Sequence, residues 1–74
     1  MIRFYLRERI SEKEFTEKRK ITLDEISGET GISKNTLSRM QSKRGYNATT
    51  DNLDKLCSYF GCALSDIVVH VEGE

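Results

Sequence analysis

This chain of 74 residues contains no proline and no tryptophan, and it has only two cysteines, Cys57 and Cys62. Two cysteines are too few for the disulfide framework of a small secreted domain. The absence of proline favours helices, since proline breaks a helix interior. The chain also lacks a long apolar run and a signal-peptide pattern, which argues against a membrane-spanning helix. We therefore expect one small domain over residues 1–74, located in the cytoplasm.

An excess of charge of one sign is lacking too, because twelve basic and twelve acidic residues give a net charge of zero. The distribution along the chain is uneven. Residues 30–50 carry four basic side chains and no acid, whereas residues 51–74 carry one basic and five acidic side chains. A neutral chain with one basic segment still docks on phosphate, since the local field and counterion release govern affinity. The basic segment is thus a candidate surface for nucleic acid.

Residues 22–42 have the pattern of two short helices joined by a glycine turn. Gly31 provides the left-handed conformation that ends the first helix, and Ser33 caps the second. Leu37 and Met40 share the inner face of that second helix. Its outer face carries no acid and consists of Lys34, Asn35, Ser38, Arg39 and Ser42.

An outer helix face of this composition suits the DNA major groove, where lysine or arginine pairs with guanine and asparagine with adenine. We assign base readout to Lys34, Asn35, Ser38 and Arg39. We assign phosphate contacts to the two helix starts and the following polar loop, at Thr22, Ser33, Ser42, Lys43, Arg44, Tyr46 and Asn47. Such contacts fix the register of a protein on DNA without carrying sequence information. The alternative is that all of these are ordinary solvated side chains.

Both ends of the chain show the alternation of a strand, over residues 1–6 and 67–72. We expect the two strands to pair into a small antiparallel sheet. A sheet of two strands is marginal in water by itself, so it must lean on the helices or on a second subunit. The terminal strands are therefore the expected contact between two copies of the chain.

A first helix is expected between Leu6 and Lys20. Its start is ambiguous, because Ser11 and Glu14 also form a capping box for a helix that begins later. We favour the early start, with fraying over the charged residues 17–20.

A fourth helix is expected to begin at Thr49 or Thr50 and to end at Gly61. Its buried face is the stripe of Leu53, Leu56, Cys57 and Phe60. One further short helical turn is expected over residues 64–68, before the terminal strand.

Metal binding and catalysis find little support in the sequence. Cys57 lies on the apolar stripe, and its spacing to Cys62 does not match the usual zinc pairs. Buried thiols and a strand-edge His70 are the better interpretation. No glycine-rich phosphate loop and no nucleophile with a suitable base is present, so we expect neither an enzyme nor a cofactor.

Over residues 29–39 and 53–62 the chain resembles the phage-repressor-like (xenobiotic response element, Cro-like) helix-turn-helix family. The resemblance implies a mainly all-α, five-helix, lambda-repressor-like domain whose third helix enters the major groove, usually as a dimer on a two-fold site. By position it places base contacts at Lys34, Asn35 and Arg39. The chain departs from the family pattern at the start of the second helix, where Leu23 replaces a frequent glutamine, and at Ser27 and Gly28.

The sequence thus predicts a sequence-specific regulator of transcription, a repressor, that binds double-stranded DNA as a homodimer. A second hypothesis is an antitoxin or adaptor whose exposed strand edge captures a protein partner by strand addition. A third is a domain that has kept the fold but lost DNA binding, for which Leu23 is the one sign.

Overall fold

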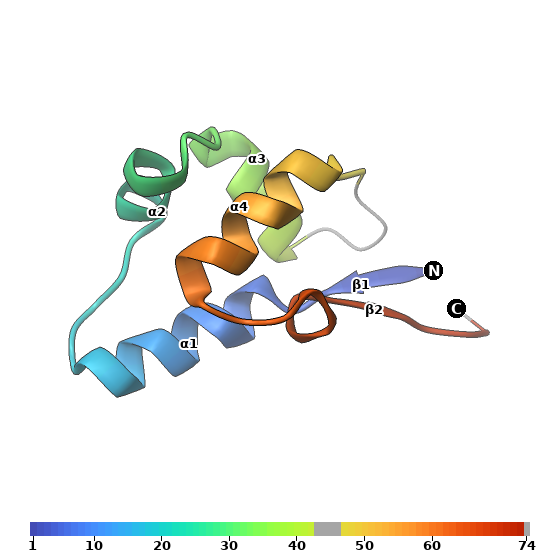
Figure 1. Ribbon diagram of the computed structural model, residues 1–74, viewed down its shortest axis with the longest axis horizontal. Helices are drawn as coiled ribbons and strands as arrows, with labels where there is room; N and C mark the ends of the chain where they lie inside the picture. The colour runs from blue at the N-terminus through green and yellow to red at the C-terminus, as the bar shows by residue number, and fades with distance from the viewer. Residues whose placement is uncertain (43–46, 74) are drawn as a thin grey trace.

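The structure is a computed structural model that describes residues 1–42 and 47–73, with Ser42 described by its backbone alone. The described ranges are mainly helical, with a small two-stranded sheet at one end (Figure 1). In chain order the elements are β1 (Ile2–Phe4), α1 (Leu6–Glu17), α2 (Leu23–Thr30), α3 (Lys34–Ser42), α4 (Thr50–Phe60), the 3-10 turn η1 (Leu64–Asp66) and β2 (Val68–His70).

The two terminal strands pair antiparallel, as the sequence predicted, with Phe4 opposite Val68. The strands run side by side away from the helices, so the two chain ends lie close together (Figure 1). Both strands are shorter than expected, at three residues each. The expected start of the second strand at Ile67 is wrong, because Ile67 is fully buried among the helices and β2 begins after it. Val68 therefore packs against the core, while Val69 is 38% exposed.

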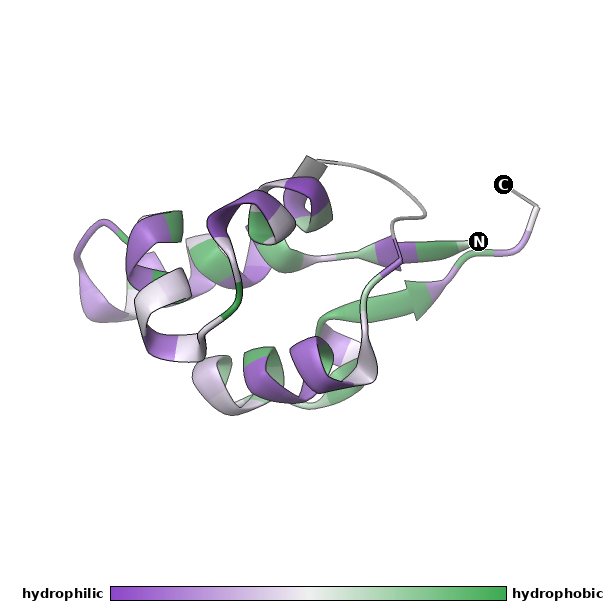
Figure 2. Cartoon of the chain, turned by 90° about the horizontal axis from the view of Figure 1, so that it is seen from above, coloured by the Kyte–Doolittle hydropathy of each residue, from purple (hydrophilic) through white to green (hydrophobic). Residues whose placement is uncertain are grey.

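The core is built from every helix and from the segments that join them. Its buried apolar side chains are Leu6, Ile10, Ile21, Ile26, Ile32, Leu37, Met40, Leu56 and Ile67. Figure 2 colours the chain by hydropathy, and its hydrophobic stretches lie in the helices and in both strands. No charged or polar residue is fully buried within the described ranges. Burial of these apolar side chains is the main force that fixes α2 and α3 relative to α4.

α1 begins at Leu6, which confirms the early start. The expected fraying over residues 17–20 is wrong, because the helix ends sharply. Lys18 adopts a left-handed conformation with φ 56°, and the Arg19 N–H donates to the Glu14 carbonyl at 3.3 Å. This arrangement closes the last turn of a helix in the manner that glycine usually provides.

The connection from α1 to α2 is held by ion pairs and by one buried contact. The Arg19 guanidinium donates to both carboxylate oxygens of Glu25, at 2.8 and 2.7 Å, and also pairs with Glu17 at 2.8 Å. The Ile21 N–H donates to the Glu14 carboxylate at 2.8 Å, and the Ile21 side chain is buried in the core. The charged connection thus anchors the start of α2 to the end of α1.

α4 has the predicted ends. The Thr49 hydroxyl accepts a hydrogen bond from the Asn52 N–H at 3.1 Å, and Gly61 ends the helix with φ 65°. The short helical turn expected over residues 64–68 is present as the 3-10 turn η1, which is shorter, at Leu64–Asp66. The described residues therefore contain four α-helices and not the five helices that the resemblance implies. Leu64, at the start of η1, is 52% exposed, so this segment has no continuous apolar face whose burial would extend it.

Candidate nucleic-acid interface

The helix-turn-helix unit is built by local hydrogen bonds at each helix end. The Thr22 hydroxyl accepts from the Glu25 N–H at 3.2 Å and caps α2. Gly31 adopts φ 79° and ends that helix. The Ser33 hydroxyl accepts from the Thr36 N–H at 3.1 Å and caps α3. These ends are the ones that the sequence predicted, and they fix the direction in which α3 leaves the turn.

The inner face of α3 is anchored in the core, and its outer face is exposed to solvent. Leu37 is 0% exposed and Met40 1% exposed, in the core beneath α3. All four residues assigned to base readout, Lys34, Asn35, Ser38 and Arg39, are exposed. Their spacing places them on neighbouring turns of one helix face. The structure therefore brings the predicted base-contacting side chains together on the surface opposite the core.

Sequence reasoning missed one neighbour of this face. The Lys34 ammonium pairs with the Asp24 carboxylate in the first turn of α2, with Nζ and Oδ1 3.0 Å apart. Both side chains are largely exposed, at 60% and 75%. Asp24 was not among the residues that the sequence assigned to the DNA-binding face. The two residues are ten positions apart in the sequence, and their contact could not be predicted because it depends on the angle between α2 and α3.

The predicted phosphate contacts divide into described and undescribed residues. Thr22, Ser33 and Asn47 are exposed. The Ser33 hydroxyl donates its hydrogen to the Thr36 hydroxyl at 2.9 Å, so a phosphate contact at Ser33 requires that hydroxyl to rotate. The predictions at Lys43, Arg44, Tyr46 and the Ser42 side chain lie outside the described residues.

A family model for the Cro/C1-type helix-turn-helix DNA-binding domain matches residues 13–73, which is most of the chain. The chain belongs to this family. The resemblance inferred from the sequence is thereby confirmed, and DNA binding is the function that the family indicates. No curated protein and no solved structure matches the chain significantly.

In this Cro/C1-type domain, Leu23 packs partly buried against the core. The position where relatives often carry a polar glutamine therefore serves packing here. Gly28, the second departure, is exposed on α2, and a Cβ built there meets no atom within 4 Å. The glycine is thus not required for close approach of a neighbouring helix.

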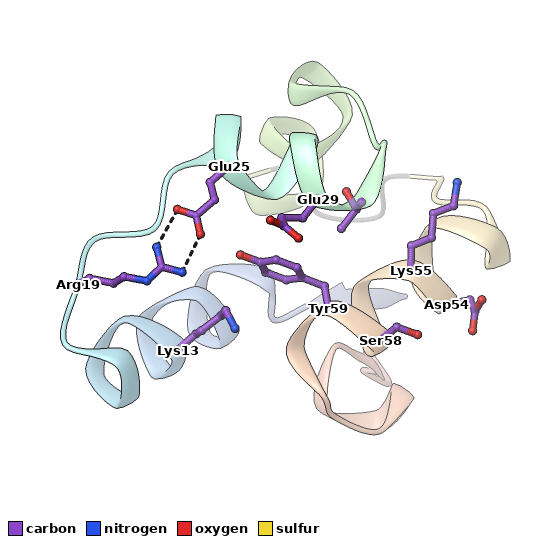
Figure 3. Close-up of a pocket in the computed structure, with 9 residues that line it drawn as sticks. Lys13, Arg19, Glu25, Glu29, Asp54, Lys55, Ser58 and Tyr59 are labelled. Carbon is purple, nitrogen blue, oxygen red and sulfur yellow. Dashed lines mark hydrogen bonds and ion pairs between the residues drawn. The ribbon is translucent and has the colours of Figure 1, made fainter.

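A cleft of about 550 Å³ lies between α1, α2 and α4 of the Cro/C1-type domain, and no described residue of α3 lines it (Figure 3). Tyr59 lies in it beneath the Lys13 ammonium, which is 4.9 Å from the ring centroid. Burial raises the pKa of the Tyr59 hydroxyl. The neighbouring Arg19 and Glu25 pair with each other, as the dashed lines in Figure 3 show. Two of the charged side chains that line the cleft are therefore paired with each other.

The two thiols of the Cro/C1-type domain sit at the end of α4. The Cys62 N–H donates to the Cys57 carbonyl at 3.1 Å, which is the hydrogen bond of a glycine-terminated helix end and brings the two side chains together. Both residues are half-buried, and burial raises the pKa of the Cys62 thiol. Residues 1–42 and 47–73 contain no cluster of three side chains suited to a metal ion. Nor does any helix within those ranges have the length and apolarity to cross a membrane.

Proposed function

We propose that this chain is a sequence-specific regulator of transcription, a repressor, that places α3 in the major groove of double-stranded DNA. The observation that carries the proposal is the two-sided character of α3. Leu37 and Met40 lock the helix to the core, while the opposite face exposes four polar or basic side chains. A rigidly held helix with such a face is the recognition element of helix-turn-helix proteins.

The proposed division of labour follows the chemistry of each side chain. Lys34 and Arg39 donate to the acceptors of guanine, and Asn35 pairs with adenine through both groups of its amide. Ser38, next to Arg39 on α3, donates a hydrogen bond to a base edge or accepts one from it. Thr22, Ser33 and Asn47, with the loop residues that follow α3, contact phosphates on either side of the groove and set the register.

We further propose that two copies act together on a two-fold site. A single α3 contacts only a few base pairs, and paired helices on half-sites about one helical turn apart double the number of contacts. The β1–β2 sheet is the proposed contact between the copies, because two strands alone are marginal in water. Ile2 and Val69 support this choice, since they leave 43% and 38% of their surface exposed on the sheet.

The same exposed strands support the second candidate function, capture of a protein partner by an antitoxin or adaptor. An unpaired strand edge offers its backbone groups to another chain, and the exposed Val69 would enter a pocket of the partner. In that version Arg39→Ala weakens DNA binding and leaves capture of the partner intact. Replacement of Val69 by lysine prevents capture of the partner and leaves the DNA-binding face of α3 unaltered.

The test is selection of the purified protein against a pool of random duplex DNA, followed by sequencing of the retained duplexes. We expect a two-fold symmetric motif. Arg39→Ala should weaken binding to it by about 1–3 kcal/mol per half-site and relax the preference at one base pair. Arg7→Ala is the matched control, because it removes the same charge from an exposed position on α1. Retention of no duplex, or of all duplexes equally, would overturn the proposed function.

The dimer has its own test, which is the molar mass of the protein measured by sedimentation equilibrium. Val69→Lys should shift the protein to the monomer. Phe15→Lys should not, although Phe15 is 83% exposed, because it lies on α1 and not on the sheet. If Val69→Lys leaves a dimer intact, the contact between the copies lies elsewhere.

A further inference from the structure

The ion pair between α2 and α3 lies at the start of the proposed recognition helix. Lys34 is the first residue of α3, and Asp24 is in the first turn of α2, two positions after the cap Thr22. Their charged atoms are 3.0 Å apart, and both side chains are mostly in water. Residues 30–50 include no acid, so the carboxylate next to the outer face of α3 belongs to a residue outside the basic segment.

The pair changes what Lys34 offers to DNA. An ammonium group has three hydrogen-bond donors, and one of them is directed at Asp24. The remaining donors still serve the acceptors of a base edge. The positive charge, however, is partly balanced by the carboxylate, and a partly balanced charge releases fewer counterions when it nears a phosphate.

From this geometry we infer that Asp24 is a specificity-determining residue, which keeps Lys34 as a hydrogen-bond donor for bases while suppressing its charge-driven attraction to phosphates. The inference rests on the proposed function. Non-specific binding comes almost entirely from phosphate contacts, whereas base contacts distinguish sequences. A residue that weakens only the phosphate contacts lowers the affinity for non-specific DNA. It therefore raises the ratio of specific to non-specific affinity.

The competing view is that Asp24 acts only through net charge or by stabilising the start of α2. An exposed pair opens easily and contributes little to stability, so folding is not a sufficient reason for its presence. The two views differ in whether the effect of Asp24 on DNA binding depends on the presence of Lys34. A double-mutant cycle separates them, since only a coupled pair gives a non-additive result.

The experiment measures binding of the full chain to two labelled duplexes by fluorescence anisotropy, as a function of salt. One duplex carries the selected motif and the other a scrambled sequence. For Asp24→Asn we expect affinity for the scrambled duplex to rise on the order of fivefold at low salt, and its log–log salt slope to steepen by up to about 0.9. Between 50 and 200 mM salt, that change of slope adds a loss of affinity of up to about 3.5-fold. Affinity for the selected motif should rise less, so the specificity ratio falls.

Two controls make the result decisive. Glu12→Gln removes the same charge from an exposed position on α1 and should leave the slope unchanged. In a Lys34→Met background, Asp24→Asn should have no more effect than Glu12→Gln. Circular dichroism checks that each variant is folded.

An equal change of slope for Asp24→Asn and Glu12→Gln, or an undiminished effect of Asp24→Asn without Lys34, would overturn the inference while leaving the proposed function intact. A wild-type protein that binds both duplexes equally would overturn both together.

Discussion

Alanine at Gly31 and alanine at Gly28 are the same chemical change at two places on or next to α2, and the structure predicts opposite effects on stability. Gly31 ends the helix in the left-handed region, with φ 79°. Gly28 lies inside α2 and has no positive φ. A Cβ at either position meets no atom within 4 Å. Contacts of the added Cβ with neighbouring atoms therefore contribute nothing. The backbone conformation alone determines whether each substitution raises or lowers the free energy of unfolding.

The magnitudes follow from the two conformations. A left-handed residue with a Cβ costs roughly 1–2 kcal/mol, and the reduced freedom of the unfolded chain offsets about 0.4–1 kcal/mol of this. Gly31→Ala should thus destabilise the domain by about 1 kcal/mol. Gly28→Ala should stabilise it by about 1 kcal/mol, the difference in helix propensity between the two residues. For a domain of this size, each change corresponds to a shift in Tm of about 4–8 °C.

Thermal unfolding followed by far-UV circular dichroism measures both shifts in the same buffer. Gly61→Ala is a third, matched variant, because Gly61 also has a positive φ, 65°, and open space around its Cβ. It should lower the Tm as Gly31→Ala does, but its place at the end of α4 leaves the turn between α2 and α3 unaltered. A shift of the same sign for Gly28→Ala and Gly31→Ala would refute the reasoning.

Three further predictions concern the core, a helix cap and pH. Leu56→Ala removes a fully buried side chain and should destabilise the domain by about 2–5 kcal/mol, measured by urea denaturation. Thr49→Ala removes the cap of α4 and should cost about 0.5–2 kcal/mol, visible as a lower Tm. The hydrogen bonds from Arg19 hold the pKa of the Glu25 carboxyl below its ordinary value of 4.5. The folded state therefore binds that proton less tightly, so this contribution to stability is present above pH 4.5 and is lost as pH falls through the lowered pKa. Arg19→Gln should flatten the dependence of Tm on pH in that acidic range, while an unchanged profile would contradict the assignment.

The helix-turn-helix unit was predictable from the sequence because its signals are local. Thr22 and Ser33 each cap the helix that follows by accepting from a backbone N–H three residues on. Gly31 ends α2 through its own backbone conformation. The periodic spacing of Leu37 and Met40 then determines which face of α3 turns inward. None of these features requires knowledge of a distant part of the chain.

The elements that the sequence failed to predict depend on distant partners. The charged run at the end of α1 suggested fraying, because a string of charged residues has no apolar face of its own. In the folded chain Arg19 reaches Glu25 on α2, and Glu14 accepts from the Ile21 backbone. The terminal strand shows the same dependence, since burial of Ile67 among the helices shifts the start of β2 by one residue.

The candidate site depends both on local sequence signals and on a contact between residues distant in the sequence. Counting charges along the sequence gives residues 30–50 four cations and no acid, which suggests a strongly positive face. In space, Asp24 pairs with Lys34, one of the two described cations of that segment, and the other is Arg39. The charges of these three side chains sum to +1. The described face of α3 is therefore rich in hydrogen-bond donors but only weakly charged. Such a composition favours recognition through the donors and acceptors of base edges over attraction to phosphates, as the proposed function requires.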